Sequence, residues 1–380
     1  MKFEANRDVF SEAVSFAVKL LPQRTTLPIL SGVLIEATGD SLILSSFDYE
    51  VSAQTEIAAT IDEPGRVVVS GRLLAEIAAK LPNAPVRVST EDNKVIVAAG
   101  SARFSLSSMP VEEYPTLPQV TGQRGLVPAD AFTEAVAQVV LAASRDDVTP
   151  VITGVNLEIS ETSLDLVATD RYRVAVRTIP WDSEDITEAV TALVPARTLQ
   201  EIGRTFAHAS QIEVILQRSE EKELIAFRAE KKTVTSLLIK GNFPPVKRLF
   251  PASVEDSAVV STAELIEATN RVQTVLERES ALRFSFSGGQ VTLEAIGSEQ
   301  AQASESIDVV LTGDDTVVSL KPQFLLDGLR SLHAEYARLG FTKTDNPNKP
   351  GPVLITAQHS KDSDGSEDYR YLLQPNLLLR

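Results

Sequence analysis

The sequence lacks cysteine entirely, and it holds only three histidines and one tryptophan in 380 residues. Without cysteine the chain cannot form disulfide bonds or a thiolate-bound zinc site, which suits a reducing cytoplasm. The three histidines, His208, His333 and His359, stand in different settings, so neither a histidine-based triad nor a histidine metal cluster is expected. No apolar run approaches the ~18 residues of a membrane helix, and the N-terminus MKFEANRDVF has no apolar signal segment. These absences predict a soluble, cytoplasmic chain.

Positive charge is also scarce, because 36 lysine and arginine residues face 52 acidic residues and leave a net charge of −16. A strongly acidic protein is repelled by phosphate, which by itself argues against binding nucleic acid. The six helices predicted below differ, since basic and acidic residues are equally numerous in them. Two basic pairs, Arg72 with Lys80 and Arg197 with Arg204, are spaced so that each pair shares a helix face. Charge alone leaves two interpretations open, an ordinary solvated face and a nucleic-acid surface.

A repeated pattern organises the rest of the chain. The stretch 149–177 aligns without a gap on the stretch 27–49 at a constant shift of 122 positions. Two unrelated hairpins would share the alternation of apolar residues, but not the same glycine, glutamate and aspartate at one fixed shift. The sequence therefore indicates a duplication, and the matched pairs are Pro28/Pro150, Gly32/Gly154, Val33/Val155, Glu36/Glu158, Ser41/Ser163, Leu42/Leu164, Leu44/Leu166 and Asp48/Asp170.

The duplication continues with a second block of matches between residues 69–77 and 194–202, and a fainter third copy lies at 282–293. A period of ~120 residues is too long for a solenoid repeat, so each copy is predicted to be a domain with its own core. Proline-containing polar linkers separate the copies. The predicted domains are 1–122, 123–252 and 253–380, with linkers at 109–125 and 241–253.

Each third of the chain shows the same order of elements, namely helix, strands, helix and strands. Apolar residues at helical spacing predict the helices, and period-2 runs across turns predict antiparallel hairpins. The fold class is therefore α+β, with three similar domains that each pack two helices on antiparallel sheets. The predicted helices are 7–21, one after Pro128 that carries Phe132, Val136, Val139 and Val140, one that carries Leu265, Val272 and Leu276, and 71–81, 195–207 and 321–332. The predicted hairpins include 33–44, 86–97 and 284–293.

No constellation of residues in the sequence indicates an active site. Asp48 and Asp170 occupy equivalent repeat positions, which favours a shared turn over a catalytic carboxylate. No phosphate-binding glycine motif stands at a junction between a strand and a helix, and Ser287-Gly288-Gly289 is typical of a hairpin turn. We therefore expect a protein that is not an enzyme and that has no metal or other cofactor.

Several motifs together resemble one known family. They are TLPIL at 26–30, FSLSSMP at 104–110, ATDRYRVA at 168–175 and NFPPVKRLFP at 242–251, and with the triplication they are similar to the bacterial DNA polymerase III β subunit, the sliding clamp. The resemblance implies the DNA clamp fold and a head-to-tail homodimeric ring around duplex DNA. It implies a processivity factor that tethers the replicative polymerase in the nucleoid. The alternative is a non-enzymatic, β-rich repeat protein for adhesion or ligand binding.

The resemblance also implies three sets of functional residues. Loose, sequence-independent contacts to phosphate are expected from Arg24, Arg72, Lys80, Arg197, Arg204 and Lys321. Val275 and Leu276 are expected at the dimer interface. The family's groove for short Gln- and Leu/Phe-containing motifs of the polymerase, the clamp loader and other partners corresponds to Ile152, Thr169, Arg171, Tyr172, Arg173, Val174, Pro244, Arg248, Leu249, Pro350, Pro352, Leu372, Leu373, Gln374, Pro375 and Asn376.

Two stretches within these sets depart from the family's pattern. Arg171 and Tyr172 stand where the family commonly has a small residue followed by histidine, and the tail reads Gln374-Pro375-Asn376 where a methionine-rich end is common. Within the groove, Val174, Leu249, Leu372 and Leu373 are expected to form an apolar floor, and Arg173 and Arg248 a charged rim.

Overall fold

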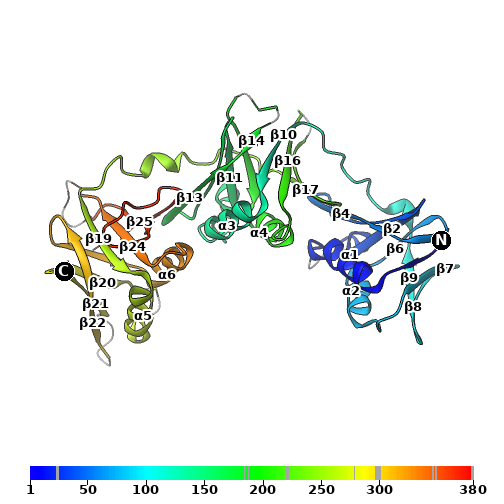
Figure 1. Ribbon diagram of the computed structural model, residues 1–380, viewed down its shortest axis with the longest axis horizontal. Coiled ribbons are helices and arrows are strands. Elements are labelled where there is room, and N and C mark those ends of the chain that lie inside the picture. The colour runs from blue at the N-terminus through cyan, green and yellow to red at the C-terminus, as the bar shows by residue number, and fades with distance from the viewer. Residues whose placement is uncertain are drawn as a thin grey trace. The chain divides into compact units, whose positions relative to one another are not determined.

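The computed structural model describes residues 1–22, 25–183, 185–186, 188–219, 222–277, 279–295, 301–344, 346 and 349–377. The chain divides into two compact units, and Figure 1 labels the helices and many of the strands. The first unit contains Met1–Thr133, Ser160–Thr162 and Pro180–Leu238. The second contains Glu134–Ile159, Ser163–Ile179 and Ile239–Arg380. The predicted domain limits at 122/123 and 252/253 differ from this division and stay a prediction.

The first unit is built on one antiparallel sheet with the strand order β14-β10-β16-β17-β18-β4-β3-β2-β6-β9-β8-β7-β1-β5. Two segments far apart in the sequence meet where β18 pairs with β4, with Lys232 opposite Thr55 and Ser236 opposite Val51. The strands of this sheet are β1 (Lys2–Ala5), β2 (Gly32–Thr38), β3 (Ser41–Phe47), β4 (Val51–Ala58), β5 (Thr60–Glu63), β6 (Gly65–Ser70), β7 (Val86–Glu91), β8 (Lys94–Ala99), β9 (Ala102–Met109), β10 (Gln123–Pro128), β14 (Asp182–Ser183), β16 (Gln211–Arg218), β17 (Glu223–Ala229) and β18 (Lys232–Leu237). The unit also contains β15 (Val190–Pro195), which is not part of this sheet.

The helices α1 (Arg7–Lys19) and α2 (Gly71–Lys80) pack side by side against the N-terminal strands (Figure 1). The side chain of Asn6 caps α1 by accepting hydrogen bonds from two backbone N–H groups of the first turn. The apolar stripe of α1 buries Phe10 and Val14 in the core of this domain. The helix ends at Lys19, two residues earlier than predicted, because the proline at 22 disfavours helical backbone just before it.

The predicted linker at 109–125 is anchored rather than free. The chain forms a short 3₁₀ turn, η2 (Val111–Glu113), and then buries the ring of Tyr114 against Leu34 and Val68. The Tyr114 hydroxyl accepts a hydrogen bond from the backbone N–H of Phe47 at 3.0 Å. A buried N–H group needs such a partner, so the linker completes the core that it leaves.

The only tryptophan of the chain lies in the first unit. Trp181 is 5% exposed, and its indole ring packs against the backbone of Gly125 in β10. A Cβ atom at position 125 would overlap that ring. Only glycine therefore lets β10 approach Trp181 this closely. The helix α4 (Ala196–Thr205) follows β15 in the same unit, and α3 (Ala129–Val140) has residues in both units.

The second unit contains an antiparallel sheet with the strand order β11-β12-β13-β26-β25-β24-β19-β22-β21-β20-β23. The helices α5 (Thr262–Val272) and α6 (Pro322–Ser331) pack against each other. The strands are β11 (Gly154–Ile159), β12 (Ser163–Thr169), β13 (Arg173–Pro180), β19 (Asp256–Ser261), β20 (Leu282–Ser287), β21 (Gln290–Ala295), β22 (Ala303–Thr312), β23 (Thr316–Leu320), β24 (Tyr336–Phe341), β25 (Val353–Gln358) and β26 (Tyr369–Leu373).

The α+β class and all six predicted helices are confirmed. The third of these helices ends at Val272 and continues as the 3₁₀ turn η5 (Gln273–Val275), where the prediction ran on to 276. The hairpin turn at Gly288 and Gly289 is also confirmed, and both glycines have positive φ. In the second linker, the 3₁₀ turn η4 (Val246–Leu249) buries Val246 and so fastens this segment to the sheet.

Candidate functional site

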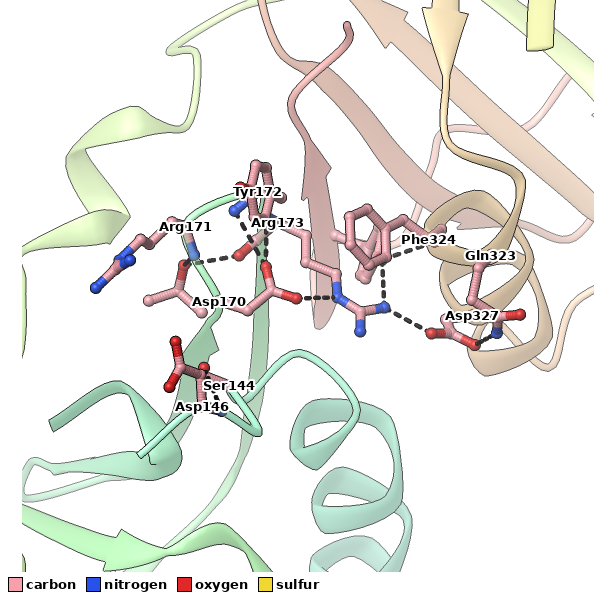
Figure 2. A network of polar contacts seen from close by, with 11 residues as sticks. Ser144, Asp146, Asp170, Arg171, Tyr172, Arg173, Gln323, Phe324 and Asp327 are labelled. Carbon is pink, nitrogen blue, oxygen red and sulfur yellow. Dashed lines mark hydrogen bonds and ion pairs between the residues drawn. The ribbon is translucent and has the colours of Figure 1, made fainter. Parts of the chain in front are cut away.

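A tight turn between β12 and β13 shapes the candidate site, and it is visible in Figure 2. The carboxylate of Asp170 accepts hydrogen bonds from the backbone N–H groups of Tyr172 and Arg173, both at 3.1 Å. The Thr169 hydroxyl donates to the carbonyl of Arg173 at 2.7 Å and accepts from the N–H of Arg171. Arg171 has φ 79°, a left-handed conformation that these side-chain bonds hold in place.

The first unit repeats this turn at Asp48. Its carboxylate accepts from the N–H groups of Glu50 and Val51 at 2.9 and 2.7 Å, and Tyr49 has φ 73°. Asp48 and Asp170 therefore play the same structural part in two copies of the repeat, as predicted. Both carboxylates are occupied by backbone donors, which suits a turn and not acid or base catalysis.

Beside the turn at Asp170 lies a cavity of about 420 Å³ within the second unit. Residues from five segments form it: the 3₁₀ turn η3 (Pro150–Thr153) with the residue before it, the turn itself, the linker, the residue that precedes β25 and the end of β26. We call this cavity the groove. Its lining is Thr149, Val151, Ile152, Thr169, Arg171, Tyr172, Arg173, Val174, Asn242, Pro244, Val246, Leu249, Pro352, Leu372 and Gln374.

Arg173 is a buried support of the groove and not part of a rim. Its side chain is 9% exposed and forms ion pairs with Asp170 at 2.9 Å and with Asp327 of α6 at 2.6 Å (Figure 2). It also donates to the Tyr371 hydroxyl at 3.2 Å, and its guanidinium lies 4.4 Å from the ring centre of Phe324. Burial by itself lowers the pKa of Arg173, but the Tyr371 hydroxyl and the two carboxylates outweigh it and raise the pKa. The expected rim position was therefore wrong.

The exposed ring next to Arg173 belongs to Tyr172. It is 56% exposed and stacks on Phe324, with ring centres 6.0 Å apart and planes inclined by 26°. The ammonium group of Lys321 lies 5.8 Å from the Tyr172 ring centre and forms an ion pair with Glu279 at 2.7 Å. Lys321, which was expected to contact DNA, thus stands beside the groove with its charge already paired.

The linker that forms one wall of the groove is held down by Lys247. The Lys247 ammonium group donates to Glu158 in β11 and to Asp165 in β12. Burial lowers the pKa of Lys247, but these two hydrogen bonds outweigh it, so the pKa is raised. On the same segment, Val246 packs in an apolar cluster with Leu372 of β26. The position of Leu249, which is 53% exposed at the groove, follows from these contacts.

The C-terminal tail contributes less to the groove than predicted. Leu373 is fully buried and lies outside the groove, because it points to the face of β26 opposite to that of Leu372. The backbone N–H of Gln374 donates to the carbonyl of Tyr172 at 2.9 Å, so the tail is tied to the turn. Asn376 then pairs with Ser319 at the end of β23. The expectation that Leu373 lies in the apolar floor was wrong.

The structure brings eleven of the predicted groove residues together, and the part of the chain that it describes contains the others as well. Arg248 is exposed on the linker, and Pro350 only accepts a hydrogen bond from Gln374 at 3.4 Å. The predicted residues that lie outside the lining are Arg248, Pro350, Leu373, Pro375 and Asn376. The lining residues that the prediction missed are Thr149, Val151, Asn242 and Val246, which all lie in the motifs TPVIT and NFPPV.

The remaining predicted residues are those expected to contact DNA and those expected at the dimer interface. Arg72, Lys80, Arg197 and Arg204 are exposed on α2 and α4. Arg72 donates to the carbonyl of Pro22 at 2.9 Å, and Arg204 pairs with Glu201 at 2.9 Å. Arg24 lies outside the described residues. Val275 and Leu276 are half-buried where α5 and η5 end.

The described residues form neither a metal-binding cluster nor a membrane-spanning helix. Among them, no group of three or more histidine, cysteine, aspartate or glutamate side chains is arranged to hold a metal ion. None of the helices they form is both long and apolar enough to cross a membrane.

Comparisons with known proteins agree along the whole chain. Three family models match in order: the DNA polymerase III beta subunit N-terminal domain at residues 1–118, its central domain at 126–245 and its C-terminal domain at 247–363. The beta sliding clamp of Streptomyces coelicolor is 44% identical over 376 residues, with 99% of both chains covered. The beta sliding clamp homolog GriR of Streptomyces muensis is 37% identical over 375 residues, again with 99% of both covered.

Solved structures give the same result. The DNA polymerase sliding clamp of Bacillus subtilis aligns with a TM-score of 0.89 and 26% identity over 100% of both chains. A sliding clamp of Pseudomonas aeruginosa, solved bound to griselimycin, aligns with a TM-score of 0.90 and 25% identity, also over 100% of both chains.

Proposed function

The chain belongs to the DNA polymerase III beta subunit family, and from this premise we propose that two copies close head to tail into a ring around duplex DNA. The protein functions as a sliding clamp in DNA replication. The proposal adds that the clamp tethers the replicative polymerase and is loaded by a partner that docks in the same groove. We infer that it supplies no catalytic residues, needs no cofactor and acts at the nucleoid in the cytoplasm.

The observation that supports the docking function is the groove. It offers an apolar lining, with Val174 and Leu372 buried at its base and Leu249 half-exposed beside them. Two apolar side chains of a short motif buried there would contribute about 3–5 kcal/mol before ordering costs. The turn beside the groove is already held in place by hydrogen bonds from its backbone N–H groups to Asp170. Little reorganisation of the protein is therefore needed when a peptide binds. We therefore expect micromolar affinity for a motif peptide.

Replacing Leu249 by alanine should weaken binding of a Gln- and Leu/Phe-containing peptide by about tenfold. The reason is that the half-exposed Leu249 side chain would no longer contact the apolar side chain that the peptide buries in the groove. Titration of a fluorescent peptide measures the loss. Val310→Ala is the matched control, since Val310 is 43% exposed on β22 and lies outside the groove. Equal affinity of both variants and the unchanged protein would place the docking site elsewhere.

For DNA, the proposal assigns loose phosphate contacts to Arg24, Arg72, Lys80, Arg197, Arg204 and Lys321. Replacing Arg72 and Lys80 by alanine should reduce the number of counterions released on DNA binding by roughly two. The affinity for DNA should then fall less steeply as the salt concentration rises. Arg66→Ala with Arg103→Ala removes the same charge from strands of the same domain and should leave that dependence unchanged. The measurement compares dissociation from circular and linear duplexes across salt concentrations.

The native mass of the protein and its retention on circular and linear DNA test the proposed ring. A chain of 41.1 kDa should give a native mass of two chains, with Val275 and Leu276 in the contact. It should remain on circular DNA and slide off linear DNA. A native mass of one chain at micromolar concentration, or equal retention on both forms of DNA, would contradict the ring and would favour an ordinary binding protein.

A further inference from the structure

A second cavity lies on the same face of the sheet as the groove. It has a volume of about 440 Å³ and lies wholly within the second unit. Its floor comes from β24, β25 and β26, and its walls come from the linker at Phe250–Val254 and the hairpin connection at Asp364–Glu367. We call it the arginine cavity, because Arg338 and Arg370 line it.

Strand register places two arginines in one row of the floor. Arg338 pairs with Thr356, and Thr356 pairs with Arg370, so the three side chains stand next to one another across three strands. In an antiparallel sheet such a row lies on a single face. Thr356 is almost buried, and both arginines are half-buried. The cavity thus presents two guanidinium groups on either side of one hydroxyl.

Neither guanidinium is neutralised. Among the described residues, Arg338 forms no ion pair or hydrogen bond, and the Nε atom of Arg370 is buried without a hydrogen-bond partner. Arg370 instead lies over the ring of Phe250, 4.9 Å from its centre. A buried donor without a partner is costly, and a chain with 52 acidic residues could have supplied a carboxylate. Two unpaired guanidiniums facing one cavity indicate a site for an anionic group.

The other charges at the cavity are two exposed carboxylates. Asp364 and Glu367 line the opposite wall, and within the described residues neither forms an ion pair with Arg338 or Arg370. They stand in solvent, where charges are strongly screened, whereas the arginines lie half-buried at the floor. An anion that reaches the floor therefore interacts more strongly with the arginines than with the exposed carboxylates.

The cavity adjoins the groove. Arg370 and Leu372 are two residues apart on the same face of β26, which places the two floors about 7 Å from each other along the strand. The linker separates them, with Leu249 lining the groove and Phe250 lining the arginine cavity. A peptide seated in the groove needs only a few further residues, at about 3.3 Å each, to pass over the linker.

We propose that the arginine cavity binds an acidic side chain of the partner polypeptide whose motif occupies the groove. The proposal rests on the docking function proposed above and adds the chemistry of the flanking residues. Arg338 and Arg370 would donate charge-assisted hydrogen bonds to the carboxylate, and the ring of Phe250 keeps the Arg370 guanidinium in place. Partners with acidic residues beside the motif would thus be favoured over partners without them.

The test compares three fluorescent peptides by titration. The first is the motif alone, the second carries six added residues with aspartate and glutamate, and the third carries the same extension with asparagine and glutamine. Extensions are placed at either end of the motif. The acidic extension should bind about tenfold more tightly than the neutral one at one end, with a smaller advantage at high salt.

Substitutions of the two arginines test whether the advantage of the acidic peptide arises at this cavity. In Arg338→Gln with Arg370→Gln the advantage of the acidic peptide should fall below about twofold, whereas the motif alone should bind as before. Arg338→Gln by itself removes one guanidinium without touching the linker, and it should lose part of the advantage. The control is Arg283→Gln, which removes the same charge from β20 and should keep the full advantage.

Every other outcome overturns the proposal. Equal binding of the acidic and neutral extensions, an advantage that survives in the double variant, or an equal loss in Arg283→Gln would each show that the cavity does not bind the acidic group. If the motif alone fails to bind the unchanged protein, the docking function is itself wrong, and this proposal falls with it.

Discussion

Replacing Arg173 by methionine is expected to lower the free energy of unfolding by about 3–5 kcal/mol, because the change leaves Asp170 and Asp327 without their buried counter-ion. Methionine has a similar length and is apolar, so the loss reports on charge and hydrogen bonds more than on volume. Calorimetric unfolding of the variant measures it. Peptide binding should weaken as well, since the same side chain holds the turn that forms the groove.

The control for this prediction is the neighbouring Arg171→Met. Arg171 is exposed and its guanidinium contacts only the Thr149 hydroxyl among the described residues, apart from its place in the groove lining. Its replacement should cost less than about 1 kcal/mol. Adding Asp327→Asn to Arg173→Met should recover part of the stability, because the uncompensated carboxylate is removed. Equal, small losses for the two arginine variants would show that the buried ion pairs do not hold the turn.

Replacing Gly328 by alanine should destabilise the protein, although alanine is the better helix former. In an exposed helix this change would stabilise by roughly 0.5–1 kcal/mol. Gly328 is buried in α6, and a Cβ atom there would lie 2.6 Å from two ring carbons of Tyr371, which is fully buried. Overpacking of this kind costs about 1–3 kcal/mol, so the clash is expected to decide the sign.

Arg330→Ala in the same helix provides the comparison, because Arg330 is exposed and both residues favour helix. It should change the free energy of unfolding by less than about 0.5 kcal/mol. The Tyr371 hydroxyl also bonds the carbonyl of Phe324 at 2.7 Å and Arg173, so a displaced ring should lower peptide affinity too. A stabilised Gly328→Ala variant would show that the ring moves aside freely.

Local patterns in the sequence were sufficient to predict the helices, the hairpins and the turns. The aspartates of the repeat illustrate why: Asp170 bonds the backbone two and three residues ahead, and such a contact depends only on neighbouring residues. The groove was predicted in outline because its segments carry recognisable motifs. Family resemblance supplied that part of the prediction, and charge or periodicity alone would not have.

Long-range contacts explain the errors. Arg173 was expected at a rim because arginines are usually exposed, but its partner Asp327 lies 154 residues away in the sequence. No local pattern reports such a pair. Leu373 could have been placed correctly, since Tyr369, Tyr371 and Leu373 alternate with Arg370 and Leu372 and therefore share the inner face of β26. The anchoring of the first linker by Tyr114 had no signal beyond one aromatic residue among prolines.

The packing of Trp181 against Gly125 has a spectroscopic consequence. Because this indole is the only one in the chain and is almost fully buried, tryptophan emission reports on the first unit alone. Denaturation followed by this emission should show a red shift when that unit opens and should not register changes confined to the groove. Peptide titrations can therefore use labelled peptides without interference from a change in this emission. Tyrosine absorbance, in contrast, reports on both units, because Tyr49 and Tyr114 lie in the first unit and the other tyrosines lie in the second.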